Sequence, residues 1–87
     1  MKKVDITKSD EFIYYLNSLR AKHQKFSIGI EETANELNIS QITLRRRVKK
    51  CENVPKFYQA NDHAKIEFKI FDVAMYLASK KSNETSY

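Results

Sequence analysis

Residues 31–50 read EETANELNISQITLRRRVKK, and they contain the strongest structural signals in the chain. Asn38 follows a short amphipathic stretch, and Asn is second only to Gly in adopting the left-handed conformation that ends a helix. Ser40 is a favourable N-cap for a following helix, while Ile39 and Leu44 have the spacing of a hydrophobic staple. These signals predict two short helices joined by a tight corner.

The second of these two helices combines an apolar side with a dense block of positive charge. Leu44, Val48 and Cys51 recur at i, i+4 and i+7, so we expect them to face the core. At about 100° per residue, the opposite side and its flanks carry Ile42, Thr43, Arg45, Arg46, Lys49 and Lys50. A helix with this outer face is suited to the groove of a polyanion.

The composition is typical of a single folded domain. The chain has 87 residues, of which 41% are hydrophobic and 31% charged. No apolar run approaches the ~20 residues of a membrane span, and residues 1–5 lack the apolar core of a secretory signal. Cys51 is the one cysteine and cannot form an internal disulfide. We therefore expect a cytoplasmic protein without a membrane partner.

The positive charge is concentrated in the middle of the sequence. The net charge is +5, but acidic and basic residues cancel over residues 1–39 and again over residues 70–87. Residues 40–69 hold eight Lys and Arg against three Asp and Glu. Solubility alone does not require this segregation, whereas a surface that contacts phosphates would produce it.

Further elements are predicted on both sides of the helix pair. An N-terminal helix at about 9–22 begins after the N-cap Ser9, and Phe12, Tyr15, Leu16 and Leu19 form its apolar side. The helix pair spans about 29–51. A β-hairpin follows at about 56–70, with a turn at 61–64, then a helix at about 71–80 and a polar tail at 81–87. This order predicts a mostly α protein with a small β-hairpin, of the α+β class.

The sequence also resembles the winged helix-turn-helix of the excisionase and MerR-type DNA-binding families. Glu32-Thr33-Ala34 and Leu37-Asn38-Ile39-Ser40 are similar to the first part of the family pattern, and Thr43-Leu44-Arg45-Arg46 to the second. The stretch from Lys65 to Leu77, with Phe68, Asp72 and Tyr76, is similar to the hairpin and following helix. The resemblance covers residues 26–80. It departs from the pattern at Asn38, which replaces the usual Gly, and in the extra N-terminal helix.

The resemblance implies a sequence-specific protein that binds double-stranded DNA through the major groove. Its biological role would be that of a small transcription regulator, or of an excisionase-like or DNA-transfer accessory factor of a plasmid or other mobile element. Such a role leaves open a homodimer, a tandem assembly on DNA, and a recombinase or relaxase as partner. The residues expected to contact DNA are Ser40, Gln41, Ile42, Thr43, Arg45, Arg46, Lys49, Lys50, Lys56, His63 and Lys65.

Other interpretations of the same residues remain open. The basic face can instead dock an acidic protein, or bind RNA or single-stranded DNA. Arg47 lies nearer the buried edge of its helix and can pair with Glu36, while Ile13 and Tyr14 lie off the apolar side and are candidates for an interface. The sequence shows no phosphate-binding Gly-rich loop, catalytic constellation or metal-ligand set, so we expect no enzyme activity, cofactor or metal.

Overall fold

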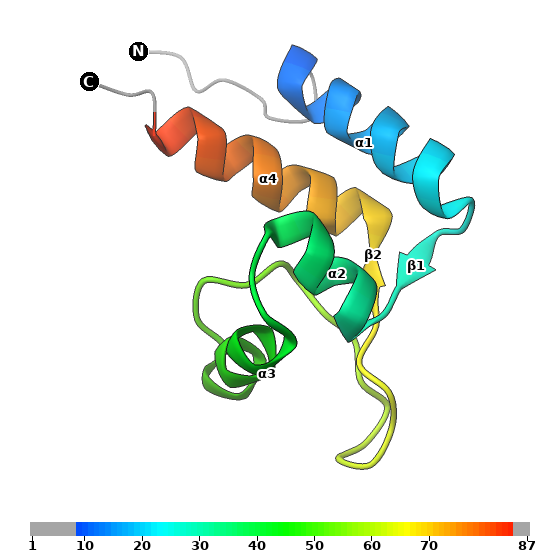
Figure 1. Ribbon diagram of the computed structural model, residues 1–87, viewed down its shortest axis with the longest axis vertical. Helices are drawn as coiled ribbons and strands as arrows, with labels where there is room; N and C mark the ends of the chain where they lie inside the picture. Colours follow the sequence, from blue (N-terminus) through cyan, green and yellow to red (C-terminus); the bar gives the residue numbers. More distant parts are fainter. Residues whose placement is uncertain (1–8, 85–87) are drawn as a thin grey trace.

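The computed structural model describes the backbone of residues 9–84 and the side chains of residues 9–79. Four helices and one short two-stranded antiparallel sheet make up the described part of the chain (Figure 1). The elements are α1 (Asp10–His23), β1 (Ser27–Ile28), α2 (Ile30–Leu37), α3 (Gln41–Lys50), β2 (Phe68–Lys69) and α4 (Ile70–Glu84). The expected mostly helical α+β class is therefore confirmed.

The predicted starts of α1 and α3 and the predicted end of α2 agree with the structure. The Ser9 side chain accepts a hydrogen bond from the Phe12 N–H, and Ser40 caps α3 in the same way through the Thr43 N–H. Asn38 ends α2 with a φ of 59° and ψ of 43°, in the left-handed region. These ends were predictable because a capping side chain acts on main-chain groups only two or three residues away.

One hydrophobic core joins all four helices and both strands. α1 packs along α4, and α2 lies between this pair and α3 (Figure 1). Leu44 and Phe68 are completely buried, and Ile39 is partly buried against the core. The buried apolar side chains are Phe12, Leu19, Ile28, Ile30, Ala34, Leu44, Val48, Phe68, Ile70, Val73, Ala74 and Ala78.

The predicted hairpin differs from the structure in its strand pairing. Residues 56–60 do not form a strand; a single bridge joins Tyr58 to Glu67, with N···O distances of 2.8 and 2.9 Å. β2 instead pairs with β1, in a register that places Ile28 opposite Phe68. This pairing buries two large side chains together, whereas the polar residues 59–65 have no apolar face to bury.

Two further predictions are wrong at helix ends. Cys51 is exposed because α3 ends there: Cys51 has a φ of 55°, and its N–H bonds back to the carbonyls of Arg47 and Val48. The last helix begins at Ile70 and continues to Glu84, so residues 81–84 are helical and only 85–87 of the expected tail lie outside the description. No helix within residues 9–84 has the length and apolar character needed to cross a membrane.

Candidate nucleic-acid interface

The turn between α2 and α3 is closed by hydrogen bonds at the end of α2 and at the start of α3. The Ile39 N–H donates to the Ala34 carbonyl at 3.0 Å, and the Leu44 N–H donates to the Ser40 carbonyl at the same distance. The Ser40 hydroxyl accepts from the Thr43 N–H at 3.1 Å and donates to Thr43 Oγ1 at 2.9 Å. Since the Ser40 hydroxyl donates its proton to Thr43, an anion at this helix start would be bound by main-chain N–H groups or by the Thr43 hydroxyl rather than by the Ser40 hydroxyl.

The outer side of α3 faces solvent over its whole length. Leu44 and Val48 are buried on the inner side, whereas Ile42 is 71% exposed on the outer side. Thr43 is half-buried because its hydroxyl is held at the helix start. The exposed residues of α3 are Gln41, Ile42, Arg45, Arg46, Lys49 and Lys50. The apolar side therefore anchors the helix, and the cationic side is left available for a partner.

Two of the three acidic side chains of α2, Glu32 and Glu36, are engaged with cations from the end of α1 and the connection after it. Glu36 Oε2 lies 2.8 Å from Lys22 Nζ and 2.9 Å from His23 Nε2. Glu32 Oε2 lies 3.2 Å from Lys25 Nζ, and Glu32 Oε1 accepts from the Gly29 N–H at 3.2 Å. These contacts fasten the N-terminal helix to α2.

The same contacts lower the pKa of both carboxyl groups. For Glu32, the Gly29 N–H lowers the pKa most; burial opposes this effect, and Lys25 and His23 add to it. For Glu36, burial is the largest influence and acts to raise the pKa, but Lys22 and His23 together outweigh it and the pKa is lowered. Both groups therefore remain ionised at neutral pH, with their charge compensated locally.

The cations of α3 have no such compensation. Within residues 9–79, no carboxylate forms an ion pair with an Arg or Lys of α3. Arg47 is half-buried, as expected from its helix position, but it does not pair with Glu36; its Nη1 lies 3.5 Å from the Asn53 carbonyl. The predicted pairing is wrong because Glu36 is held by Lys22 and His23. α3 thus presents a concentration of uncompensated positive charge.

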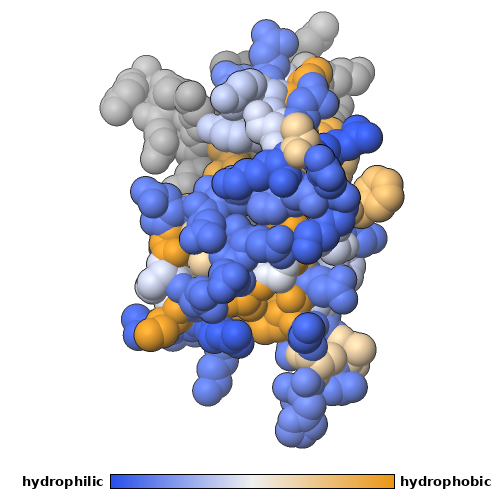
Figure 2. Space-filling view, turned by 45° about the vertical axis from the view of Figure 1, so that its right-hand side comes forward, coloured by the Kyte–Doolittle hydropathy of each residue, from blue (hydrophilic) through white to orange (hydrophobic). Residues whose placement is uncertain are grey.

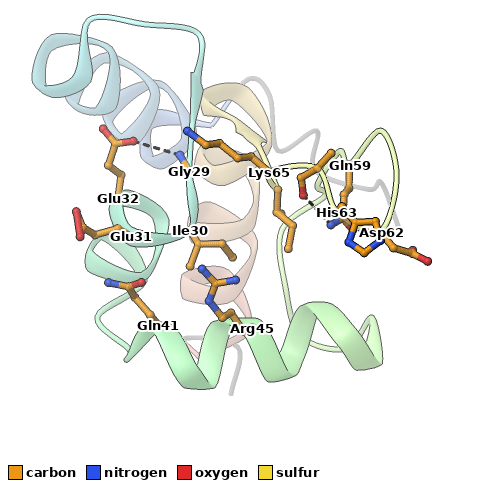
Figure 3. Close-up of a pocket in the computed structure, with 12 residues that line it drawn as sticks. Gly29, Ile30, Glu31, Glu32, Gln41, Arg45, Gln59, Asp62, His63 and Lys65 are labelled. Carbon is orange, nitrogen blue, oxygen red and sulfur yellow. Dashed lines mark hydrogen bonds between the residues drawn. The ribbon is translucent and has the colours of Figure 1, made fainter.

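An open hollow of about 620 Å³ lies between α3, the start of α2 and the loop at residues 59–66. Gln41 and Arg45 enter it from α3, and His63 and Lys65 from the loop (Figure 3). The complete lining is Gly29, Ile30, Glu31, Glu32, Gln41, Arg45, Gln59, Asp62, His63, Ala64, Lys65 and Ile66. The loop projects from the same end of the molecule as α3 (Figure 1), so both can contact one extended partner.

The loop is held in shape by its own hydrogen bonds. Gln59 Nε2 donates to the Ala64 carbonyl at 2.9 Å, and the His63 N–H donates to Asn61 Oδ1 at 2.9 Å. The Ala64 N–H also donates to the Asn61 carbonyl at 3.0 Å. The turn-forming composition of residues 61–64 predicted the loop itself. Its position beside α3 could not be predicted, because that position depends on how β2 docks on the core.

Of the three hairpin residues expected to contact DNA, His63 and Lys65 line this hollow and Lys56 does not. The Lys56 Nζ is 5.7 Å from the centre of the Tyr58 ring, which Lys69 also approaches, at 4.7 Å. Gln59, Asp62 and Glu31 also line the hollow but were not among the residues expected to contact DNA. Glu31 and Asp62 are both exposed, and their carboxylates would oppose an anion there.

The surface on this side is mostly hydrophilic. Figure 2 shows hydrophilic groups over most of the visible face, with hydrophobic groups between them in its lower half. Within the described residues, no group of three or more His, Cys, Asp and Glu side chains is placed to hold a metal ion.

In comparisons with known proteins, no family model, no curated protein and no solved structure matches this chain.

Proposed function

We propose that this chain is a winged helix-turn-helix protein that binds double-stranded DNA at specific sequences, with α3 as its recognition helix and residues 58–67 as its wing. One observation carries the proposal: a rigidly mounted helix has a buried apolar side and a solvent-facing cationic side without acidic partners. A helix of this kind fits the major groove of B-DNA, which is about 12 Å wide.

The exposed side chains of α3 differ in what they can contribute to binding. Gln41 can form two hydrogen bonds with an adenine, and Arg45 or Arg46 can do so with a guanine. Ile42 extends an apolar side chain suited to a thymine methyl group. Lys49 and Lys50 lie in the last turn, where they can contact phosphates without distinguishing bases.

The hollow suggests how the loop takes part. His63 and Lys65 enter it opposite Arg45, so a DNA backbone that follows the edge of the groove would meet cations from both elements. In this arrangement α3 reads the groove and the loop fixes the orientation of the protein on the duplex. The protein would act in the cytoplasm, as a transcription regulator or as an accessory factor in excision or DNA transfer of a mobile element.

Selection of binding sites from random duplex DNA, followed by gel-shift titration, tests the proposal. A recovered sequence motif would support it, and absence of duplex binding even at low salt would refute it. Competition with single-stranded DNA and RNA oligonucleotides tests the alternative that the same face binds unpaired strands. Preferential binding of those competitors would replace the duplex proposal.

A further inference from the structure

A second surface, remote in the sequence from α3, has the features of a protein-binding site. Phe26 is 84% exposed, and Phe71 is 46% exposed. Both line a hollow of about 280 Å³, which we call the Phe26 surface; its lining is Leu16, Arg20, Phe26, Lys69, Ile70 and Phe71. Most of that lining is apolar, and two cations, Arg20 and Lys69, lie among the apolar side chains.

The main chain at Phe26 is held in place by hydrogen bonds. The Phe26 carbonyl accepts a hydrogen bond from the Ile70 N–H at 2.8 Å, and the next two residues form β1 and pair with β2. The Phe71 ring packs edge-on against Phe12, with ring centres 5.2 Å apart. The main chain of Phe26 and the ring of Phe71 are thus already positioned, so ordering them costs little conformational entropy on binding, which favours contact residues of an interface.

The charge around Phe26 indicates the chemistry of the partner. Phe26 also lines a smaller neighbouring hollow with Arg20, Gln24 and Lys25, and no Asp or Glu lines either hollow. Lys25 is paired with Glu32, but among residues 9–79 no carboxylate pairs with Arg20 or Lys69. The Phe26 surface is therefore apolar at its centre and positive at its edge.

A second copy of the chain does not fit this distribution. In a twofold interface the same surface faces itself, so Arg20 and Lys69 would approach identical cations. The volume is just below the roughly 300–1,000 Å³ of small-molecule pockets, which suits one inserted side chain better than a whole ligand. We propose that the Phe26 surface binds an acidic segment of a partner protein that inserts an aromatic or branched aliphatic side chain beside Phe26.

Selection from a library of random linear peptides displayed on phage, with the full chain as bait, tests this proposal. We expect enriched peptides that combine Asp or Glu with Phe, Leu or Trp. Their affinity should fall at least about tenfold in Phe26→Ser and in Arg20→Ser, since the first change removes the aromatic contact and the second removes a cation that would pair with the acidic side chain. Arg46→Ser is the matched control, because it removes an exposed cation from α3, and it should leave the affinity unchanged.

The remaining outcomes would overturn the proposal. These are the absence of enriched peptides, peptides that bind Phe26→Ser as tightly as the original chain, and peptides whose binding is lost in Arg46→Ser. A chain that is dimeric by light scattering and becomes monomeric in Phe26→Ser would show that the occupant is a second copy. Melting followed by circular dichroism confirms that Phe26→Ser is folded, and its DNA binding, measured separately, should be unchanged.

Discussion

Thr33 offers a direct test of the packing of α2, because its hydroxyl is buried and makes no hydrogen bond with any described residue. The side chain is 0% exposed, and within residues 9–79 Oγ1 has no hydrogen-bond partner. A buried polar group in this state costs about 1–3 kcal/mol relative to one that is satisfied. Thr33→Val replaces the hydroxyl with a methyl group of similar size, and Val and Thr have nearly equal helix propensity.

Thr33→Val should therefore stabilise the protein by about 1–3 kcal/mol. For a domain of this size, each kcal/mol corresponds to a rise in melting temperature of about 4–8 °C. Urea denaturation and thermal melting, both followed by circular dichroism, measure the change. Thr43→Val is the matched control, because the Thr43 hydroxyl accepts from Ser40 Oγ at 2.9 Å; it should be neutral or destabilising.

A decrease in stability on Thr33→Val would refute this reasoning. It would show that the hydroxyl has a partner in solution, for example the carbonyl of Gly29 one turn earlier in the helix. That carbonyl already accepts from the Thr33 N–H at 3.0 Å. Thr33→Ser would then be the informative companion, since it keeps the hydroxyl and removes only the methyl group.

Three more predictions concern the core, the proposed DNA-binding face and the link between α1 and α2. Leu44→Ala should destabilise the protein by about 2–5 kcal/mol in urea denaturation, because Leu44 is completely buried; a change below about 1 kcal/mol would contradict the observed packing. Arg46→Ala should reduce discrimination between DNA sites by about 1–3 kcal/mol, whereas Lys49→Ala should weaken binding to all sequences alike and lower its salt dependence. If site selection and gel shifts show that the two substitutions have equal effects, α3 does not read the groove as proposed. Stability should decrease as the pH drops below about 4.5, the ordinary pKa of Glu36. In Glu36→Gln, the melting temperature measured over a pH series should depend less on pH in this range.

The sign of the pH effect follows from the lowered pKa of Glu36. A carboxyl group whose pKa is lower in the folded state than in the unfolded state contributes stability above the unfolded pKa. That contribution is lost as pH falls through the folded pKa, when Glu36 is protonated and its contacts with Lys22 and His23 weaken. A stability profile of Glu36→Gln that falls as steeply as that of the original chain would show that other carboxyl groups dominate.

The residues that could be assigned from the sequence act over short distances along the chain. Ser9, Asn38 and Ser40 determine where helices begin and end, because a cap or a left-handed residue acts on main-chain groups within one turn. The spacing of Leu44 and Val48 determines which side of α3 is buried, and hence that Arg46 and Lys49 face solvent. The proposed reading helix was therefore predictable before any tertiary contact was known.

Contacts between distant residues were decided only by the tertiary structure. Glu36 pairs with Lys22 and His23 rather than Arg47 because α1 packs its basic end against α2. β2 pairs with β1 rather than with residues 56–60 because this buries Phe68 against Ile28. The hollow shared by α3 and the loop, and the Phe26 surface, arise from the same docking. Side-chain periodicity specifies the buried face of an element, but only packing of the whole chain selects the element it meets.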